Sequence, residues 1–212
     1  MRALLLEHGV ALPLGVNTLP GRLPALREDA ENELSDATRA LLAILYEQWQ
    51  SLRSQVAQCE AKIHAWHRQN AASLRLAALP GVGVLTATAL LGSIGDATLF
   101  RNGRQLAAYF GLVPRQRSSG GKEKLLGITK RGDGYVRTLL IHGARAVVRW
   151  ARQRQRAGAA SDPWLMALLG RMHANKVAVA QANKTARIAW ALLAHDRSYS
   201  AGVGTSVCTD DA

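Results

Sequence analysis

A short glycine-rich stretch places two adjacent serine hydroxyls, Ser118 and Ser119, directly before Gly120 and Gly121. Seven basic residues surround it in the sequence: Arg115, Arg117, Lys122, Lys124, Lys130, Arg131 and Arg137. A serine hydroxyl can attack a phosphorus centre once it loses its proton and once positive groups neutralise the phosphoryl oxygens. These residue types therefore indicate phosphodiester chemistry on a nucleic acid, with one serine as the nucleophile.

The same stretch permits a simpler interpretation, in which the basic residues only bind phosphates and the serines do no chemistry. The nearest acids in the sequence are Glu123 and Asp133, and Asp133 is better explained as the N-cap of a following helix. The stretch therefore has no obvious general base. Residue chemistry alone leaves both interpretations open.

Positive charge is concentrated around this stretch. The chain has 212 residues and a formal net charge of +12. Residues 79–160 contain 14 basic and 3 acidic residues, a net charge of +11, against 0 for residues 1–78 and +1 for residues 161–212. Fixed positive charge attracts phosphates and releases their counterions. We therefore expect DNA as the partner, because a basic face kept only for solubility would not need this segregation.

Other classes of site have little support. The two cysteines and six histidines have no recognised metal-ligand spacing, so we expect neither a metal site nor a cofactor in this chain. The chain has no apolar run of about 20 residues that could span a membrane. Glu7 and His8 interrupt any signal-peptide core near the start. A cytoplasmic location is expected.

The first 70 residues divide into two segments. Residues 1–24, with three prolines, are expected to form short extended pieces and turns, a remnant linker. Residues 25–70 contain neither glycine nor proline and predict a long coiled-coil-like helix or a helical hairpin. Its apolar positions alternate three and four apart: Leu42, Leu45, Trp49, Leu52, Val56, Cys59, Ile63 and Trp66. The packing partner is either a second copy of the chain, giving a homo-oligomer through residues 38–66, or an antiparallel helix of the same chain.

Residues 71–196 predict a compact helical domain, and residues 197–212 a disordered tail, so the fold class is mostly α. The turn from Leu79 to Gly83 resembles a helix-hairpin-helix turn, which predicts phosphate contacts at Gly81 and Gly83. A common tight turn is the alternative. Strand-like alternation is confined to residues 3–18 and 112–128.

Later helices have clear start signals. Asp133 predicts a helix over about 134–156, and the Asp162-Pro163 pair predicts another that runs to about 173, before a last helix over about 175–194. The first of these three is amphipathic. Its polar face carries Arg137, Arg145, Arg149, Arg152 and Arg154.

Several motifs together resemble the C-terminal domain of the IS-one-ten transposases of bacterial insertion sequences. They are Leu79-Pro-Gly-Val-Gly83, Gln105-Leu-Ala-Ala-Tyr-Phe-Gly-Leu-Val-Pro114, Ser119-Gly-Gly-Lys122, Ile128-Thr-Lys-Arg-Gly-Asp133 and Val136-Arg-Thr-Leu-Leu140. The resemblance covers about residues 70–195. Residues 25–70 look like the coiled-coil region that precedes this domain.

The resemblance implies a function in DNA transposition. A serine directly before glycine is the family's nucleophile for DNA strand exchange, so it matches Ser119, with Ser118 as the neighbouring alternative. The family also implies a RuvC-like N-terminal domain, whose four acidic residues bind divalent metal. Mg²⁺ is therefore expected only with that domain. Oligomers and a structured guide RNA are further implied partners.

The acidic domain of the family should lie upstream of residue 1, so the chain is expected to be a C-terminal fragment, inactive by itself. The acids between Glu28 and Asp36 cluster at one helix start and are not dispersed metal ligands. Two alternatives follow. The chain could be a non-catalytic nucleic-acid-binding and oligomerisation module, or a helix-hairpin-helix accessory protein of DNA repair, which would not require the Ser-Gly loop.

Overall fold

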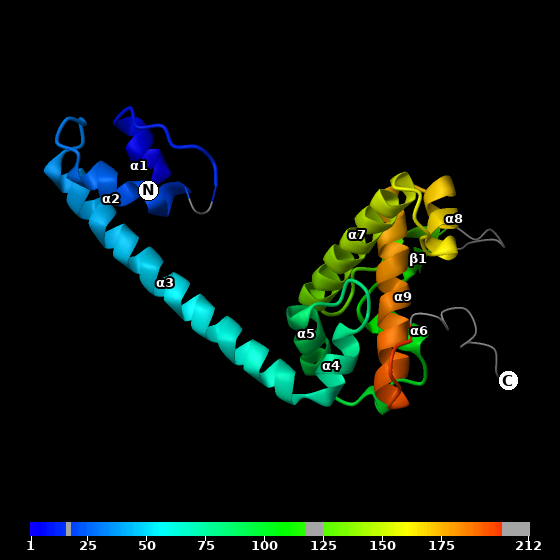
Figure 1. Ribbon diagram of the computed structural model, residues 1–212. Helices are drawn as coiled ribbons and strands as arrows, with labels where there is room; N and C mark the ends of the chain where they lie inside the picture. Colours follow the sequence, from blue (N-terminus) through cyan, green and yellow to red (C-terminus); the bar gives the residue numbers. More distant parts are fainter. Residues whose placement is uncertain (16–17, 118–124, 201–212) are drawn as a thin grey trace. The chain divides into compact units, whose positions relative to one another are not determined.

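The computed structural model describes residues 1–15, 18–117 and 125–200, and the chain divides into two compact units, Met1–Lys62 and Ile63–Ala212. Nine α-helices and one two-stranded sheet account for the regular structure of these described residues (Figure 1). The expectation of a mostly α fold, with a long helix followed by a compact helical region, is confirmed.

The first unit consists of helices α1 (Arg2–Glu7) and α2 (Thr18–Glu28) and most of the long helix α3 (Asp36–Gln69). Four buried leucines hold these helices together: Leu5, Leu23, Leu34 and Leu42. Arg39 reinforces the α2–α3 connection, because its guanidinium donates to the backbone carbonyls of Arg27 at 2.6 Å and Asp29 at 2.8 Å. The first unit thus has its own small core.

The prediction of extended pieces in residues 1–24, including the strand-like alternation at 3–18, is wrong. Residues 2–7 and 18–28 are helical although Pro20 and Pro24 lie within α2. Pro20 lies in the first turn, where a backbone N–H has no helical partner to lose. Pro24 would leave the carbonyl of Pro20 without its usual donor. The hydroxyl of Tyr46 donates to that carbonyl instead, at 3.4 Å.

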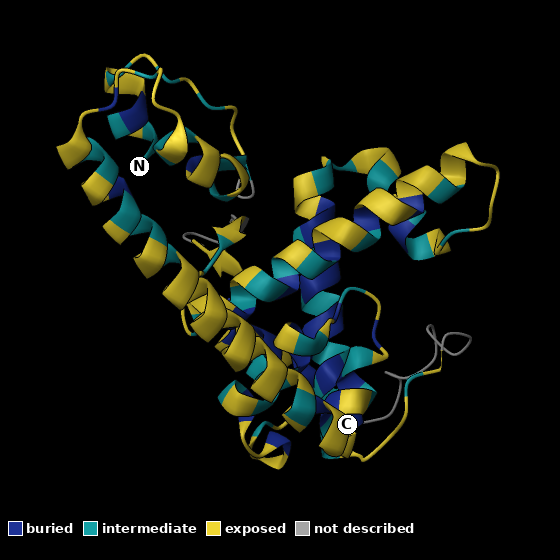
Figure 2. Cartoon of the chain, turned by 60° about the vertical axis from the view of Figure 1, so that its left-hand side comes forward, coloured by how far each residue is buried: buried dark blue, intermediate teal, exposed yellow. Residues whose placement is uncertain are grey.

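Helix α3 continues beyond this small core. Every residue from 51 to 62 is exposed, including Leu52 and Val56 of the predicted heptad seam (Figure 2). Within the first unit, the described residues therefore provide no partner for this part of the seam. The coiled coil itself remains a prediction.

The second unit begins at Ile63, within the last turns of α3. Its helices are α4 (Ala71–Ala77), α5 (Val84–Ile94), the 3-10 turn η1 (Ala97–Leu99), α6 (Gly103–Tyr109), α7 (Gly134–Arg156), α8 (Pro163–Arg171) and α9 (Ala174–Ala194). Strands β1 (Pro114–Gln116) and β2 (Leu125–Ile128) form a hairpin between α6 and α7, within the 112–128 stretch where strand-like alternation was predicted.

The core of the second unit lies between α7 and α9, with α5, α6 and α8 packed around them (Figure 2). Phe110, Leu106 and Val177 are fully buried there. Trp190 on α9 fixes the segment before α6, because its indole N–H lies 3.1 Å from the carbonyls of both Ala97 and Phe100. This core contacts the base of the hairpin through Leu112.

Side-chain caps explain where these helices begin. Asp133 accepts hydrogen bonds from the first-turn amides of α7, and Asp162 does the same for α8, as predicted. Asn70 and Asn102 cap α4 and α6 in the same way. The predicted span of α7, about 134–156, is confirmed.

Among the described residues, we find no helix that is both long and apolar enough to cross a bilayer.

Candidate nucleic-acid interface

The predicted Ser-Gly loop falls between strands β1 and β2 in the sequence. Ser118, Ser119, Lys122 and Lys124 fall outside the described residues, but the strands that carry the loop are described. Pro114 pairs with Ile128 and Gln116 with Leu125 in antiparallel register, with an irregularity between them. Two further backbone hydrogen bonds continue the hairpin toward α6 and α7. The Thr129 amide donates to the Val113 carbonyl at 2.9 Å, and the Lys130 amide donates to the Gly111 carbonyl at 3.2 Å. The two ends of the loop are therefore held together.

Two glycines allow the base of the hairpin to pack against the end of α6. Gly132 has φ of +77°, and a Cβ there would lie 1.8 Å from the carbonyl oxygen of Tyr109. Gly111, with φ of +67°, faces the backbone of Arg131 in the same way. Any side chain at either position would push the hairpin away from the helical core.

Asp133 joins the hairpin to two helices. One carboxylate oxygen accepts from the amides of Tyr135 at 2.8 Å and Val136 at 3.1 Å, and the other accepts from the Ser93 hydroxyl at 3.0 Å. The hydrogen bond from the Val136 amide is the main cause that lowers the pKa of Asp133, with help from Ser93, Tyr135 and Arg137. A carboxylate held in its ionised form by several donors is a weak proton acceptor, which fits the cap that was predicted.

Arg137 was predicted to neutralise phosphate, but its described contacts lie within the protein. Its guanidinium donates to the carbonyls of Phe110 and Arg131, each at 3.1 Å. The side chain is half-buried. Arg137 therefore holds the base of the hairpin against α7.

The other described cations of the hairpin face solvent. Arg115, Arg117, Lys130 and Arg131 are all exposed. Lys130 adopts a left-handed backbone conformation with φ of +56°, at the turn between β2 and α7. The hairpin thus exposes four positive side chains, with Arg115 and Arg117 in or next to β1 and Lys130 and Arg131 after β2.

The turn before α5 has a structural explanation at one of its two glycines. Gly81 has φ of +82°, and a Cβ there would lie 2.7 Å from the carbonyl oxygen of Gly143 on α7. Gly83 is the exposed N-cap residue of α5, with open space around it. The turn and α7 therefore pack backbone against backbone. Phosphate contact at Gly81 and Gly83 stays a prediction.

Sequence reasoning did not identify Ser93 or Gly143. Both act through residues far away in the chain, Ser93 on Asp133 and Gly143 on Gly81. Gly143 offered a signal, since a glycine within an amphipathic helix often marks a close approach of another backbone. Ser93 offered none.

A different serine, Ser73, has a histidine partner but is fully buried. Its hydroxyl lies 2.6 Å from Nδ1 of His67 at the junction of α3 and α4. Because no DNA can reach it, this pair stabilises the junction and is no rival to the hairpin serines.

The carboxylates of the second unit are all engaged within the described residues. Asp96 caps η1, with its pKa lowered mainly by the side-chain hydrogen bond from Thr98, and Asp133 caps α7. Asp162 caps α8 and pairs with Lys184, whereas Asp196 pairs with Arg75. In the described part of the chain, no three potential metal ligands lie together. The expectation that Mg²⁺ binds only with another domain stays a prediction.

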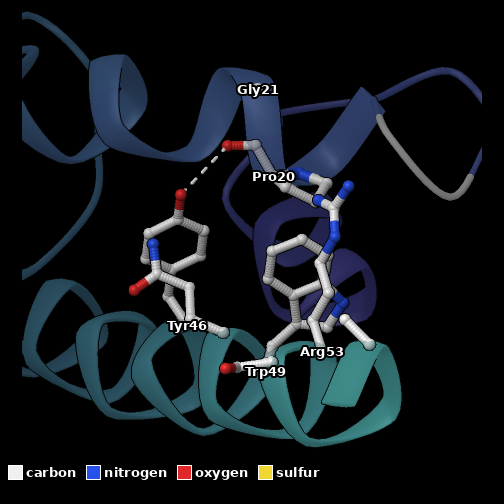
Figure 3. Close-up of a pocket in the computed structure, with 8 residues that line it drawn as sticks. Pro20, Gly21, Tyr46, Trp49 and Arg53 are labelled. Atoms are coloured by element: carbon white, nitrogen blue, oxygen red, sulfur yellow. Dashed lines mark hydrogen bonds between the residues drawn. The ribbon is translucent and has the colours of Figure 1, made fainter. Parts of the chain in front are cut away.

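The first unit contains an aromatic hollow of about 640 Å³ between α2 and α3 (Figure 3). Tyr46 and Trp49 stack with ring centroids 5.9 Å apart, and Arg53 lies over the Trp49 ring at 5.1 Å. The sequence had placed Trp49 in the heptad seam. The structure shows that it lines this hollow beside Pro20.

Comparison with known proteins identifies relatives for most of the chain. Residues 73–159 match the model of the IS116/IS110/IS902 transposase family. The chain is 51% identical over 185 residues to a probable family 20 transposase of Pseudomonas aeruginosa, which covers 87% of this chain and 51% of that protein. It is 39% identical over 202 residues to the transposase of insertion sequence element IS1111A of Coxiella burnetii, covering 95% of this chain and 55% of that protein.

A third relative is the transposase of insertion sequence element IS1328 of Yersinia enterocolitica, 36% identical over 200 residues, or 94% of this chain and 58% of that protein. The chain therefore spans about half the length of the curated relatives that it matches.

Proposed function

We propose that this chain binds the DNA of an insertion sequence and supplies the serine nucleophile for its strand exchange, because residues 73–159 match the model of the IS116/IS110/IS902 transposase family. The relatives are named as transposases of insertion sequences. The assignment of DNA binding and of the nucleophile to particular residues is our proposal.

The observation that carries the proposal is the hairpin whose strands flank the Ser-Gly loop in the sequence. Its base is fixed to the helical core by Gly132, Asp133 and Arg137. Its exposed side chains are cationic. A rigid support with outward-facing cations suits a loop that must bring a hydroxyl to a phosphodiester.

In the proposed reaction, Oγ of Ser119 attacks the phosphorus of a DNA phosphodiester. A bond forms between serine oxygen and phosphorus while the bond from phosphorus to one DNA sugar oxygen breaks. The serine proton passes to a base outside the described residues or to solvent, and the departing sugar oxygen takes up a proton. Arg115, Arg117 and Lys130 offset the negative charge that develops on the phosphoryl oxygens.

Helix α3 supplies the proposed contact between copies of the chain. Its apolar residues at positions 52 and 56 are exposed in the first unit, and a second α3 packed along this seam would bury them. The structured guide RNA implied by the resemblance is retained as a proposed partner. The non-catalytic module remains the second candidate, because it needs the same basic surface without serine chemistry.

The test is a covalent trapping assay with labelled DNA that carries the ends of an insertion sequence. The full chain is used alone and joined to an acidic N-terminal domain from a relative. We expect the joined protein to form a DNA adduct that survives denaturing electrophoresis, is lost in Ser119→Ala and persists in Ser118→Ala. An adduct that persists in the double variant would contradict serine catalysis. Binding without any adduct would favour the non-catalytic module.

A further inference from the structure

A groove of about 530 Å³ lies between α7 and the start of α9, apart from the hairpin. Four arginines of α7 line it: Arg145, Arg149, Arg152 and Arg156. Val148 and Ala178, both buried, provide apolar lining between the two helices. All four arginines are exposed, so the groove is an accessible cationic surface.

The spacing of these arginines suits a regular polyanion. They recur at intervals of four, three and four residues, which puts them on one face of the helix. At 1.5 Å per residue the stripe is about 16 Å long. A DNA duplex rises about 3.4 Å per base pair, so the stripe spans the axial length of about five base pairs and their phosphates.

Nothing described in the protein neutralises this stripe. None of its arginines forms an ion pair or side-chain hydrogen bond with a residue in the described ranges. Arg137 and Arg154, which the sequence analysis assigned to the same polar face, differ from the arginines of the stripe because they have partners within the protein. Arg137 is bonded to backbone carbonyls, and Arg154 lies over the Trp150 ring at 4.7 Å while donating to the carbonyl of Ala160. The arginines of the stripe repel one another until an anion sits among them.

Helix α9 adds to the positive potential. Its N-terminal residues Ala174 and Asn175 line the same groove, and the helix extends for 21 residues. The positive end of its dipole therefore faces the arginine stripe. The described carboxylates of this unit are engaged as helix caps or in ion pairs, so they do not offset this potential.

We propose that this groove binds the phosphate backbone of duplex DNA, as a contact additional to the Ser-Gly hairpin. The proposal rests on the function proposed above, that the chain binds DNA. No aromatic side chain lines the groove. Single-strand binding relies on bases stacked on aromatic rings, so a duplex held through its phosphates is the better fit. The contact would be independent of base sequence.

Salt-dependent binding tests the groove directly. The full chain and the variant R145Q/R149Q/R152Q are titrated with a fluorescent DNA duplex between about 50 and 200 mM salt. Removing one phosphate-binding cation should reduce the slope of log K against log salt by about 0.9. We expect the variant to bind at least about tenfold more weakly at the lowest salt, with a slope reduced by about 3.

A matched control removes the same charge elsewhere in the second unit. Arg101, Arg104 and Arg171 are exposed and do not line the groove. The control R101Q/R104Q/R171Q should retain most of the affinity and of the slope. Equal losses in both variants would overturn the proposal, because they would reflect net charge and not the groove. Thermal melts of both variants should match the wild type.

The outcomes separate this proposal from the function on which it rests. If the wild type binds duplex DNA and the groove variant binds it equally well, the groove proposal fails and DNA binding stands. If the wild type binds no duplex DNA, both fail. If the variant loses affinity for a structured RNA but not for the duplex, RNA is the occupant and the duplex assignment is wrong.

Discussion

The two units of the chain differ in what they bury and in what they expose. Residues 1–62 contain six basic and eight acidic residues, a net charge of −2, whereas residues 63–212 contain 21 basic and seven acidic residues, a net charge of +14. The first unit buries a small leucine cluster and exposes apolar side chains along α3. The second buries a much larger core and exposes arginines. The proposed apolar association and the proposed phosphate binding thus belong to separate units.

The second unit has more than charge to support this division. Its described carboxylates are used in caps and ion pairs, and Gly81, Gly111, Gly132 and Gly143 are among the glycines that make close backbone contacts. These carboxylates are therefore not left to pair with the exposed cations of the second unit. Arg39 of the first unit differs from these exposed cations, because its guanidinium donates hydrogen bonds to backbone carbonyls of the same unit.

The largest expected effect is at Gly132, where the hairpin meets α6. In Gly132→Ala, holding an alanine in the left-handed backbone conformation costs about 1–2 kcal/mol. The overlap of its Cβ with the Tyr109 carbonyl adds about 1–3 kcal/mol. We expect the free energy of unfolding to fall by roughly 3 kcal/mol or more, measured by urea denaturation. Gly92→Ala is the control, because Gly92 lies within α5 with open space around it. An equal loss in both variants would contradict the close approach.

A smaller effect, confined to the other unit, is expected at Leu42. This fully buried leucine belongs to the four-leucine cluster. Leu42→Ala should lower the stability of the first unit by about 3 kcal/mol. Hydrogen exchange followed by mass spectrometry should show faster exchange in residues 2–28 and unchanged exchange in residues 84–94. Loss of protection in both units would mean that they do not fold separately.

Sequence analysis located the elements of the second unit because their signals are local. Asp133 and Asp162 each cap the helix that directly follows them, and each was placed correctly. The first unit was misjudged because its prolines were taken as helix breakers. The carbonyl that Pro24 leaves free is bonded by Tyr46, 26 residues away from Pro20, and no local pattern reveals such a partner.

Some features of the candidate site could likewise be predicted from the sequence, whereas others depend on the fold. The exposed cations of the hairpin were found from composition and spacing, since charge in a glycine-rich loop needs no tertiary partner. The hydrogen bonds of Arg137 within the protein were not predicted, because only the fold brings the carbonyls of Phe110 and Arg131 to its guanidinium. The groove between α7 and α9 was missed for the same reason, as α9 supplies one of its walls.

The smallest expected effect concerns Asp133 and pH. Because the folded protein lowers the pKa of this carboxyl, its charge contributes stability at neutral pH, and that contribution is lost as pH falls through the lowered pKa. Asp133→Ala should cost about 1 kcal/mol at pH 7. Asp133→Asn keeps a capping oxygen but cannot titrate.

The pH arm compares the wild type with Asp133→Asn by urea denaturation from neutral to acidic pH. The stability advantage of the wild type should shrink as the solution becomes more acidic. An advantage that grows in acid would mean that the pKa is raised in the folded state and not lowered.

One measurement tests the division of labour between the units most directly: the affinity of the full chain for duplex DNA after equal charge removal in each unit. R22Q/R53Q/K62Q removes three exposed cations from the first unit, and R115Q/R117Q/K130Q removes three from the hairpin. We expect the first variant to bind within about twofold of the wild type and the second at least about tenfold more weakly. Weaker binding in the first variant, with the second unaffected, would contradict the account.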